Sequence, residues 1–239
     1  MSEQNRSLDV LGIKPIAESV NTVTKAAVDG AGAFLGRICL PAAEEFGLLL
    51  RDKVSAWRTK NAVSVTQKAQ ALFEKLPHPE KRHAHPRIVG AVVENSSWCD
   101  DDAIQSMWAG LLATSCTDDG VDQSNLVFIN TLSQLTTSEV KILNYACEAA
   151  KKDKSAGGWI NVEEELVVPL AKLMEISDQL DVHRLDLELD HLRELGLLWP
   201  IAGFRMDSTD ALLSPSAFGL QLYVRGQGFI GSPLEYFGL

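Results

Sequence analysis

Apolar residues recur at steps of three and four positions along much of the chain, a spacing that places them on one face of an α-helix. Between residues 20 and 76 this pattern is almost uninterrupted, and the alternating pattern of a β-strand is nearly absent. Phe34, Leu35 and Ile38 form one such apolar stripe. Because a helix has to bury its stripe against a neighbouring element, we predict a mainly α-helical fold.

A second stripe begins directly after three consecutive aspartates, Asp100–Asp102. Met107, Trp108 and Leu111 belong to that stripe, and we place Trp108 in the core. Carboxylates at a helix N-terminus accept hydrogen bonds from unpaired backbone N–H groups and are favoured by the helix dipole. We therefore predict that the acidic cluster starts a helix and does not hold a metal ion.

The helical pattern is broken between residues 77 and 87, where three prolines occur within ten residues. The same segment carries His78, His83 and His85, but no Asp, Glu or Cys lies at an offset that would complete a four-ligand metal shell. We predict an exposed linker with incidental histidines.

Three helices followed by a β-hairpin are predicted in the last hundred residues. The helices begin at Thr137 or Ser138 as N-cap, near Val168, and at Val182, and the third is expected to end before Gly196. The strand candidates lie within residues 197–206 and 211–224, separated by a polar turn. This order of elements is typical of a winged-helix module.

Two further features of this part of the chain are interpreted as ordinary features of turns and helix surfaces. Residues 151–165 read as a charged, glycine-containing turn, and Glu163, Glu164 and Glu165 suit the first turn of a helix. His183 and His191 are interpreted as side chains on a solvated helix face.

The predicted fold class is mainly α, with an N-terminal helical region and a C-terminal winged-helix-like module that carries a short β-hairpin. The predicted segments are a polar tail (1–20), a basic amphipathic helical region (21–76), a Pro/His linker (77–87), middle helices (88–134), the winged-helix-like module (135–228) and a C-terminal tail (229–239).

Charge is unevenly distributed in this chain of net charge −10. Residues 37–87 hold ten Lys or Arg and five acids, whereas residues 88–239 hold nine bases and twenty-three acids. We favour the interpretation that the two parts form complementary surfaces within an assembly. The alternative is that the first, basic part meets anionic lipid or phosphate. The predicted third helix, residues 181–194, carries five acids and two arginines, so it would be repelled by DNA. We expect it to contact protein, either a second copy of the chain or another partner, and we do not expect DNA binding.

The sequence favours a cytoplasmic protein. Its four cysteines match no metal or disulfide spacing, the N-terminus lacks the apolar stretch of a signal peptide, and no run approaches the length of a membrane-spanning helix. Basic residues alternate with apolar ones in the N-terminal region, which allows either a core-facing stripe or peripheral membrane contact on activation. Arg37, Trp57, Arg58 and Asn61 are the candidate interaction residues there.

Enzymatic chemistry is not expected. The motifs of α/β-hydrolases, phosphate-binding loops, zinc proteases and dinucleotide-binding folds do not occur in the sequence. Cys99 stands beside aspartates, whose charge disfavours its thiolate. We predict no catalytic residues, no cofactor and no metal.

Several segments resemble the abortive infection alpha family of bacterial proteins. They are GAFLGRICLPAAEEFGLLLRDKVSAWRTKNAVSVTQKA (32–69), DDDAIQSMWAGLLATS (100–115), INTLSQLTTSEVKILNYA (129–146), LDHLRELGLL (189–198) and LSPSAFGLQLYVRG (213–226). The resemblance spans roughly residues 25–226 in the same order.

This resemblance implies a role in bacterial defence against phage, by growth arrest or death of infected cells, and it implies no catalytic residues. We therefore expect a non-enzymatic anti-phage defence protein whose N-terminal helices engage a membrane or a host target. Two alternatives stay open: a winged-helix transcriptional regulator, and an adaptor or immunity-type protein for a neighbouring defence effector.

Overall fold

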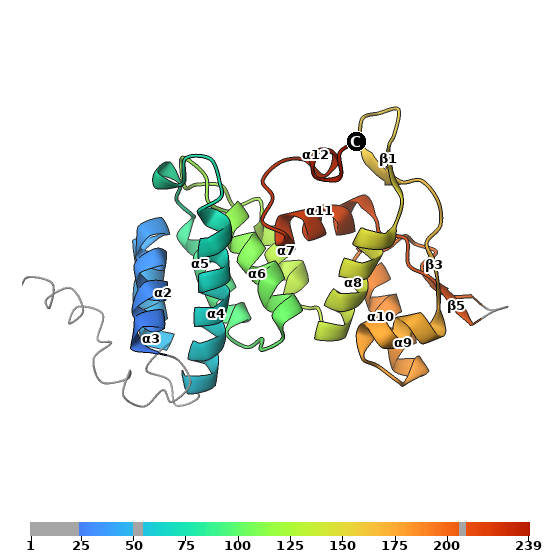
Figure 1. Cartoon of the computed structure of the whole chain (residues 1–239), viewed down its shortest axis with the longest axis horizontal. Coiled ribbons are helices and arrows are strands. Elements are labelled where there is room, and N and C mark those ends of the chain that lie inside the picture. The colour runs from blue at the N-terminus through green and yellow to red at the C-terminus, as the bar shows by residue number, and fades with distance from the viewer. Residues whose placement is uncertain (1–23, 50–54, 206–208) are drawn as a thin grey trace, which may run out of the picture. The chain divides into compact units, whose positions relative to one another are not determined.

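The computed structural model describes residues 24–49, 55–205 and 209–239, and the chain divides into two compact units (Figure 1). Unit 1 ends at Asn130 and unit 2 begins at Thr131. Both units are dominated by helices, and a small antiparallel β-hairpin is present, so the predicted fold class is confirmed as mainly α. The predicted polar tail 1–20 lies outside the described residues.

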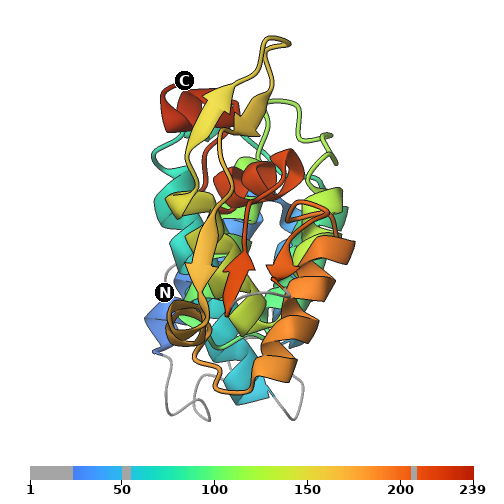
Figure 2. The same cartoon turned by 90° about the vertical axis from the view of Figure 1, so that its right-hand side faces the viewer.

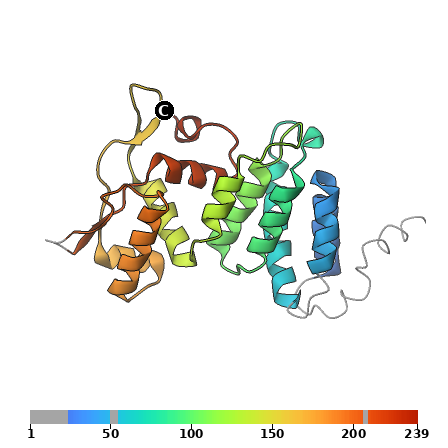
Figure 3. The ribbon, with the colours of Figure 1, turned by 180° about the vertical axis from the view of Figure 1, so that it is seen from behind.

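Unit 1 is built from helices packed around α4. Its elements are α2 (Lys25–Ile38), α3 (Leu40–Leu49), α4 (Ser55–Phe73), η2 (Pro79–Lys81), α5 (Pro86–Ser96), α6 (Asp102–Thr114) and the greater part of α7 (Leu126–Leu132). Helix α4 packs against α2, α5 and α6, which Figures 1 and 3 show from opposite sides.

The apolar stripes of these helices form the core of unit 1. Phe34 of α2 meets Phe73 of α4 edge to face, with ring centroids 5.5 Å apart. Leu35 and Ile38 are fully buried, and so is Trp108 of α6, as predicted. The stripe read from the N-terminal sequence therefore faces the interior of unit 1 in α2.

The acidic cluster starts a helix, as predicted. Asp101 is the N-cap of α6, and its side chain accepts a hydrogen bond from the Ala103 N–H at 2.8 Å. Asp102 lies in the first turn and pairs with Lys68 of α4 at 2.6 Å. This capping and pairing accounts for two of the three aspartates without a metal ion.

The Pro/His segment is part of unit 1 and does not separate two units. His83 pairs with Thr117 in an isolated β-bridge, and Arg82 donates to the carbonyls of Pro77 and Cys116. The side chain of His85 accepts from the Arg87 N–H as the N-cap of α5. The prolines interrupt the helical pattern, but the segment stays attached to unit 1. The hydrogen bonds above connect it to α5 and to the end of α6.

Unit 2 combines helices with two small antiparallel sheets. Its elements are α8 (Thr137–Ala149), β1 (Lys152–Lys154), β2 (Ile160–Val162), β3 (Val167–Pro169), α9 (Leu170–Ser177), α10 (Val182–Glu194), β4 (Gly203–Phe204), β5 (Asp210–Leu212), α11 (Ala217–Gly226) and α12 (Pro233–Phe237). Strands β1 and β2 form one sheet, and the other has the order β3-β5-β4. The predicted hairpin is therefore confirmed as β4 and β5.

The helices of unit 2 begin close to the predicted positions. Thr136 is the N-cap of α8, one residue before the predicted range, and forms a capping box with Glu139. Helix α10 ends before Gly196, whose φ of 71° favours glycine. Val168 lies in β3, and α9 starts only after Pro169, which supplies no N–H to the preceding ladder.

Three further predictions for unit 2 were wrong. Residues 211–224 are strand only at their start, because Ser216 caps a helix, α11, whose buried Leu220 and Val224 are four residues apart. The predicted charged turn is the β1–β2 hairpin. Glu163 and its two neighbours lie between β2 and β3, where Glu163 pairs with Lys151 at 2.9 Å.

The C-terminal tail contains α12, which lies beside the β1–β2 hairpin (Figure 2). The Lys152 ammonium is 4.3 Å from the ring centroid of Phe237. Tyr223 of α11 contacts Tyr236 edge to face and stacks on Phe237. These aromatic contacts hold the end of the chain against α11 and the hairpin.

Among the described residues, no helix is both long enough and apolar enough to cross a membrane.

Candidate functional site

Three of the four candidate interaction residues come together in unit 1, at the end of α5. Trp57, Arg58 and Asn61 all lie on α4 and face the last turn of α5 and the residues after it. Arg37 lies elsewhere, at the end of α2.

Arg58 is a buried cation that joins α4 to α5. Its Nε donates to Ser97 Oγ at 3.0 Å, and its terminal nitrogen donates to Glu94 Oε2 at 2.7 Å. The guanidinium carbon lies 4.2 Å from the ring centroid of Trp98. The side chain is only 8% exposed, so its charge is balanced by this carboxylate and this ring rather than by water.

The surface above this buried cation is aromatic. Trp57 is 39% exposed and Trp98 is 51% exposed, with ring centroids 6.3 Å apart. The indole N–H of Trp98 donates to Glu94, and the Asn61 amide donates to the Ser97 carbonyl. Arg58 and Asn61 therefore make internal contacts, and the site presents the two indoles and the Glu94 carboxylate to solvent.

Arg37 is half-exposed and makes a different set of contacts. Its guanidinium carbon lies 5.5 Å from the ring centroid of Phe34 and 5.1 Å from that of Phe73. Glu74 is 3.9 Å away, which makes a loose surface pair of little energetic weight. Arg37 thus covers the edge of the core.

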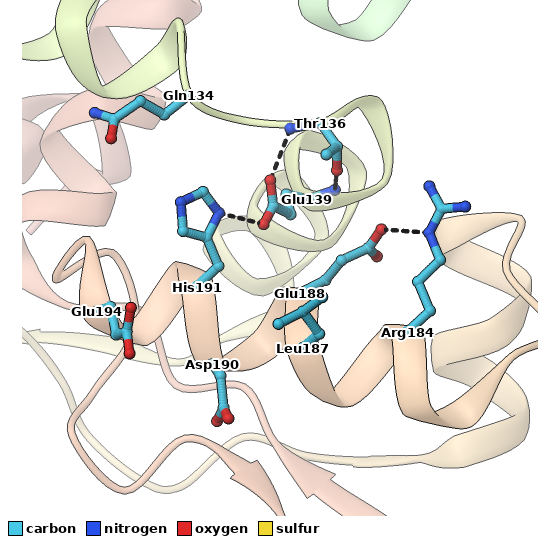
Figure 4. A pocket seen from close by; sticks show the side chains of 9 residues that line it. All are labelled: Gln134, Thr136, Glu139, Arg184, Leu187, Glu188, Asp190, His191 and Glu194. Atoms are coloured by element: carbon cyan, nitrogen blue, oxygen red, sulfur yellow. Dashed lines mark hydrogen bonds and ion pairs between the residues drawn. The ribbon is translucent and has the colours of Figure 1, made fainter.

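A second polar site, which the sequence did not predict, lies in unit 2 between α10 and the start of α8 (Figure 4). It is a hollow of about 420 Å³ that contains charged, polar and apolar groups. Its lining consists of Gln134, Thr136, Glu139, Arg184, Leu187, Glu188, Asp190, His191 and Glu194.

Glu139 joins the two helices from the α8 side. One carboxylate oxygen accepts from the Thr136 N–H at 2.7 Å, which completes the capping box. The other oxygen is 2.6 Å from His191 Nδ1 of α10. Opposite an ionised carboxylate, which only accepts hydrogen bonds, the imidazole donates from Nδ1. Glu139 is almost completely buried, so His191 is fixed in orientation by this bond.

Glu188 joins the same helices from the α10 side. It is buried, accepts a short hydrogen bond from Ser138 Oγ, and pairs with Arg184 Nε at 3.3 Å. His191 was predicted to be a solvated side chain; it is 35% exposed, but its Nδ1 is bonded to the buried Glu139. The detectable signals were the capping-box spacing of Thr136 and Glu139 and the i,i+4 spacing of Arg184 and Glu188.

The outer face of α10 remains exposed. Leu187 is 68% exposed, and Asp186 and Glu194 are exposed as well. Asp190 forms an i,i+3 pair with Arg193 at 2.6 Å. The outer face of α10 therefore presents an exposed leucine among acidic side chains.

The cysteines lack the features of reactive nucleophiles. Burial raises the pKa of Cys116 to about 12 and also raises the pKa of Cys147. Burial raises the pKa of Cys99, and the neighbouring Asp100 carboxylate adds to the increase. The direction agrees with the prediction for Cys99, although burial is the larger cause. In the part of the chain that the structure describes, no group of three or more His, Cys, Asp or Glu is placed to hold a metal ion.

The family model of abortive infection alpha proteins matches residues 60–210, more than half of the chain. The chain belongs to the abortive infection alpha family. The match contains the whole lining of the α8–α10 hollow, whereas Arg37, Trp57 and Arg58 precede it. It also excludes most of the N-terminal segment, residues 32–69, on which part of the sequence resemblance rests. No curated protein and no solved structure shows significant similarity to the chain.

Proposed function

We propose that this chain is a non-enzymatic anti-phage defence protein that acts by abortive infection, through contacts with other macromolecules. Membership of the abortive infection alpha family is the observation that carries the defence role. Contact rather than catalysis is supported by what the two polar sites do: their buried ions tie helices together, and the groups left exposed are indoles, a leucine and surface charges.

Unit 2 is proposed to be a winged-helix-like module. The order helix α8, strand β3, helices α9 and α10, then strands β4 and β5 supports this, as does the antiparallel order β3-β5-β4. In such an arrangement α10 occupies the place of the helix that enters the DNA major groove.

The chemistry of α10 favours a protein partner over DNA. Five acids and two arginines lie between Asp181 and Glu194, and Arg184 is already engaged with Glu188. A helix in the major groove has to approach phosphates, and neutralisation by Lys or Arg supplies most of the affinity. A salt-dependent shift of duplex DNA by the purified protein would instead favour the transcriptional regulator.

The N-terminal helices are proposed to engage a membrane or a host target after an infection signal, from a cytoplasmic resting state. The apolar face of α2 is buried, so membrane contact would require α2 to leave unit 1. The exposed indoles of Trp57 and Trp98 are the part of unit 1 suited to meet a lipid interface or a protein without such a change.

The decisive experiment is a phage challenge of cells carrying this gene, at low and high multiplicity, with a membrane-potential dye present. Protection at low multiplicity, with culture collapse and early depolarisation at high multiplicity, is the expected result for a membrane-acting effector. Protection without depolarisation would keep the defence role and point to an intracellular target. Failure to protect against every phage of a broad panel would contradict the proposed function.

Variants connect this phenotype to the aromatic site. Trp57→Ala with Trp98→Ala is expected to reduce protection, while Trp159→Ala, which removes a more exposed indole on the β1–β2 hairpin, is the control. Liposome flotation of the same proteins separates lipid contact from protein contact. Co-purification with the product of a neighbouring gene, together with inactivity of the protein alone, would favour the adaptor.

A further inference from the structure

Residues 229–239, here called the strap, form a small folded segment at the end of unit 2. Ser232 is the N-cap of α12 and forms a capping box with Glu235, so the first turn of this helix is closed by its own side chains. Before the helix, the ring of Phe229 turns back and meets Tyr236 edge to face, with ring centroids 5.5 Å apart. The strap therefore has a defined shape that is set largely by contacts within it.

The strap covers a site on α11 and the β1–β2 hairpin, which it contacts through aromatic rings (Figures 1 and 2). Tyr236 meets Tyr223 of α11 edge to face at 6.0 Å between ring centroids, and Phe237 stacks on the same ring at 6.3 Å. The Lys152 ammonium of β1 is 4.3 Å from the ring centroid of Phe237. Beneath these groups Tyr223 is only 4% exposed. Tyr223 and Lys152 thus define the docking site of the strap.

The attachment of the strap is superficial. No residue of the strap is buried, whereas α11 beneath it contributes six residues to the core. Two hydrogen bonds join the start of the strap to α11: the Phe229 N–H donates to the Val224 carbonyl, and Arg225 donates to the Ile230 carbonyl, both at 3.3 Å. A segment with few buried contacts opens locally while the rest of the unit stays folded. The docking site can therefore be uncovered without unfolding α11.

We propose that residues 229–239 are a detachable strap, and that the docking site beneath it binds the same segment of a second copy of this chain when the strap is detached. The bound strap shows the chemistry of that ligand: a capped helical turn that presents one tyrosine edge and one phenylalanine face. A second copy carries the identical segment, so the contacts between copies repeat those within one chain. The tethered strap competes at a high effective concentration, so the closed chain blocks its own site.

Hydrogen–deuterium exchange of the full chain tests whether the strap detaches. The Tyr236 N–H, which is bonded inside the strap, is expected to exchange at least about tenfold faster than the Leu220 N–H of α11. Lys152→Ala removes the ammonium that lies over the strap and is expected to raise the exchange rate of α12 about two- to fivefold. Lys154→Ala removes an exposed lysine from the same strand and is the matched control, which should leave this rate unchanged.

A fluorescently labelled peptide with the sequence of residues 229–239 tests whether the docking site binds the segment from another molecule. The recipient is the full-length chain with Tyr236→Ala and Phe237→Ala, whose own strap lacks both docking rings. Fluorescence anisotropy is expected to show at least about tenfold tighter binding to this variant than to the unmodified chain, because the competing strap has been weakened. A peptide that carries the same two alanines is the control and should not bind. Circular dichroism verifies that the variant is folded.

Each measurement has a result that would overturn the proposal. Exchange of the strap as slow as that of α11 would show that the strap does not detach. Failure of the peptide to bind the folded variant, or equal binding to the variant and the unmodified chain, would reject a site that the strap blocks. Equal binding of the alanine peptide would reject recognition through the two rings. The inference does not rest on the defence role, which the phage challenge tests separately.

Discussion

The polar cluster of unit 1 and that of unit 2 tie helices together in opposite ways. In unit 1 the buried ion is a cation, Arg58, and its carboxylate partner Glu94 is largely exposed. In unit 2 the buried ions are the anions Glu139 and Glu188, and their basic partners reach the surface. In both units the buried member of each pair joins two helices, while the exposed member contributes to the surface of the site.

The surfaces differ accordingly. Above Arg58 the exposed groups are the indoles of Trp57 and Trp98 and the carboxylate of Glu94. Along α10 they are a leucine and acids, with Arg184 at one end. Unit 1 therefore presents indoles beside one carboxylate, and unit 2 presents an acidic helix face with an exposed leucine.

The largest effect is expected from removing the buried cation. Arg58→Ala eliminates the ion pair with Glu94, the bond to Ser97 and the contact with Trp98, and should lower the free energy of unfolding by about 3 kcal/mol. Lys60→Ala, an exposed position on the same helix, should change it by less than about 0.5 kcal/mol. Urea denaturation measures both, and similar losses for the two variants would contradict the structural role of Arg58.

A smaller loss is expected when a buried anion of unit 2 loses its partner. His191→Ala leaves the Glu139 carboxylate buried with only the Thr136 N–H, which should cost about 2 kcal/mol. His183→Ala, on an exposed position of the same helix, is the control. If the two histidine variants unfold at the same urea concentration, the bond between α8 and α10 contributes nothing to stability.

Exposing the Arg58 guanidinium to water should lower the free energy of unfolding by less than removing the Arg58 side chain does. Trp98→Ala eliminates the ring above Arg58 and exposes the guanidinium to water, for a loss of about 1 kcal/mol. Trp159→Ala removes an indole that is more exposed and should have almost no effect. A thermal shift assay compares the two, and a larger loss for Trp159→Ala would reverse this assignment.

The smallest effect on the free energy of unfolding is expected from two buried thiols, Cys116 in unit 1 and Cys147 in unit 2. Both have a raised pKa. Burial raises the pKa of Cys116 to about 12 and raises that of Cys147. The unfolded thiol titrates at about 8.5, so the unfolded state loses its proton first and stability falls as pH rises above that value. Below it the contribution is constant. Thiol labelling of the native protein at pH 8 should modify Cys99 slowly and the other two only on unfolding, and rapid native labelling of Cys116 or Cys147 would be inconsistent with their burial.

Local sequence signals located most helices, including the start of α6 and the end of α10, but not the bounds of the short strands. The spacing of Met107, Trp108 and Leu111 and the aspartates before them identified α6 and its start. Residues 211–224 were misread because their apolar content suits a strand as well as a helix, and Ser216 as N-cap was overlooked. Strands of two or three residues, such as β3 and β4, are too short for a periodicity to appear.

The candidate site was predictable only in part. Trp57, Arg58 and Asn61 were singled out as basic, polar and aromatic residues of one helical region, without any indication that Arg58 would be buried. Glu188 and His191 appeared as ordinary surface residues of an acidic helix. The burial of Glu188 and the fixed orientation of His191 depend on contacts with Ser138 and Glu139, about fifty residues earlier in the chain.

The sequence by itself determined the helical class, the start of α6 and the family. These follow from the spacing of apolar residues, from capping chemistry and from short sequence segments, which are properties of neighbouring residues. Only the tertiary structure decided which charges are buried and which surfaces are left exposed. The reason is that burial of Arg58, Glu139 and Glu188 is set by the helix packed against each of them, and the sequence of one helix does not specify its neighbour.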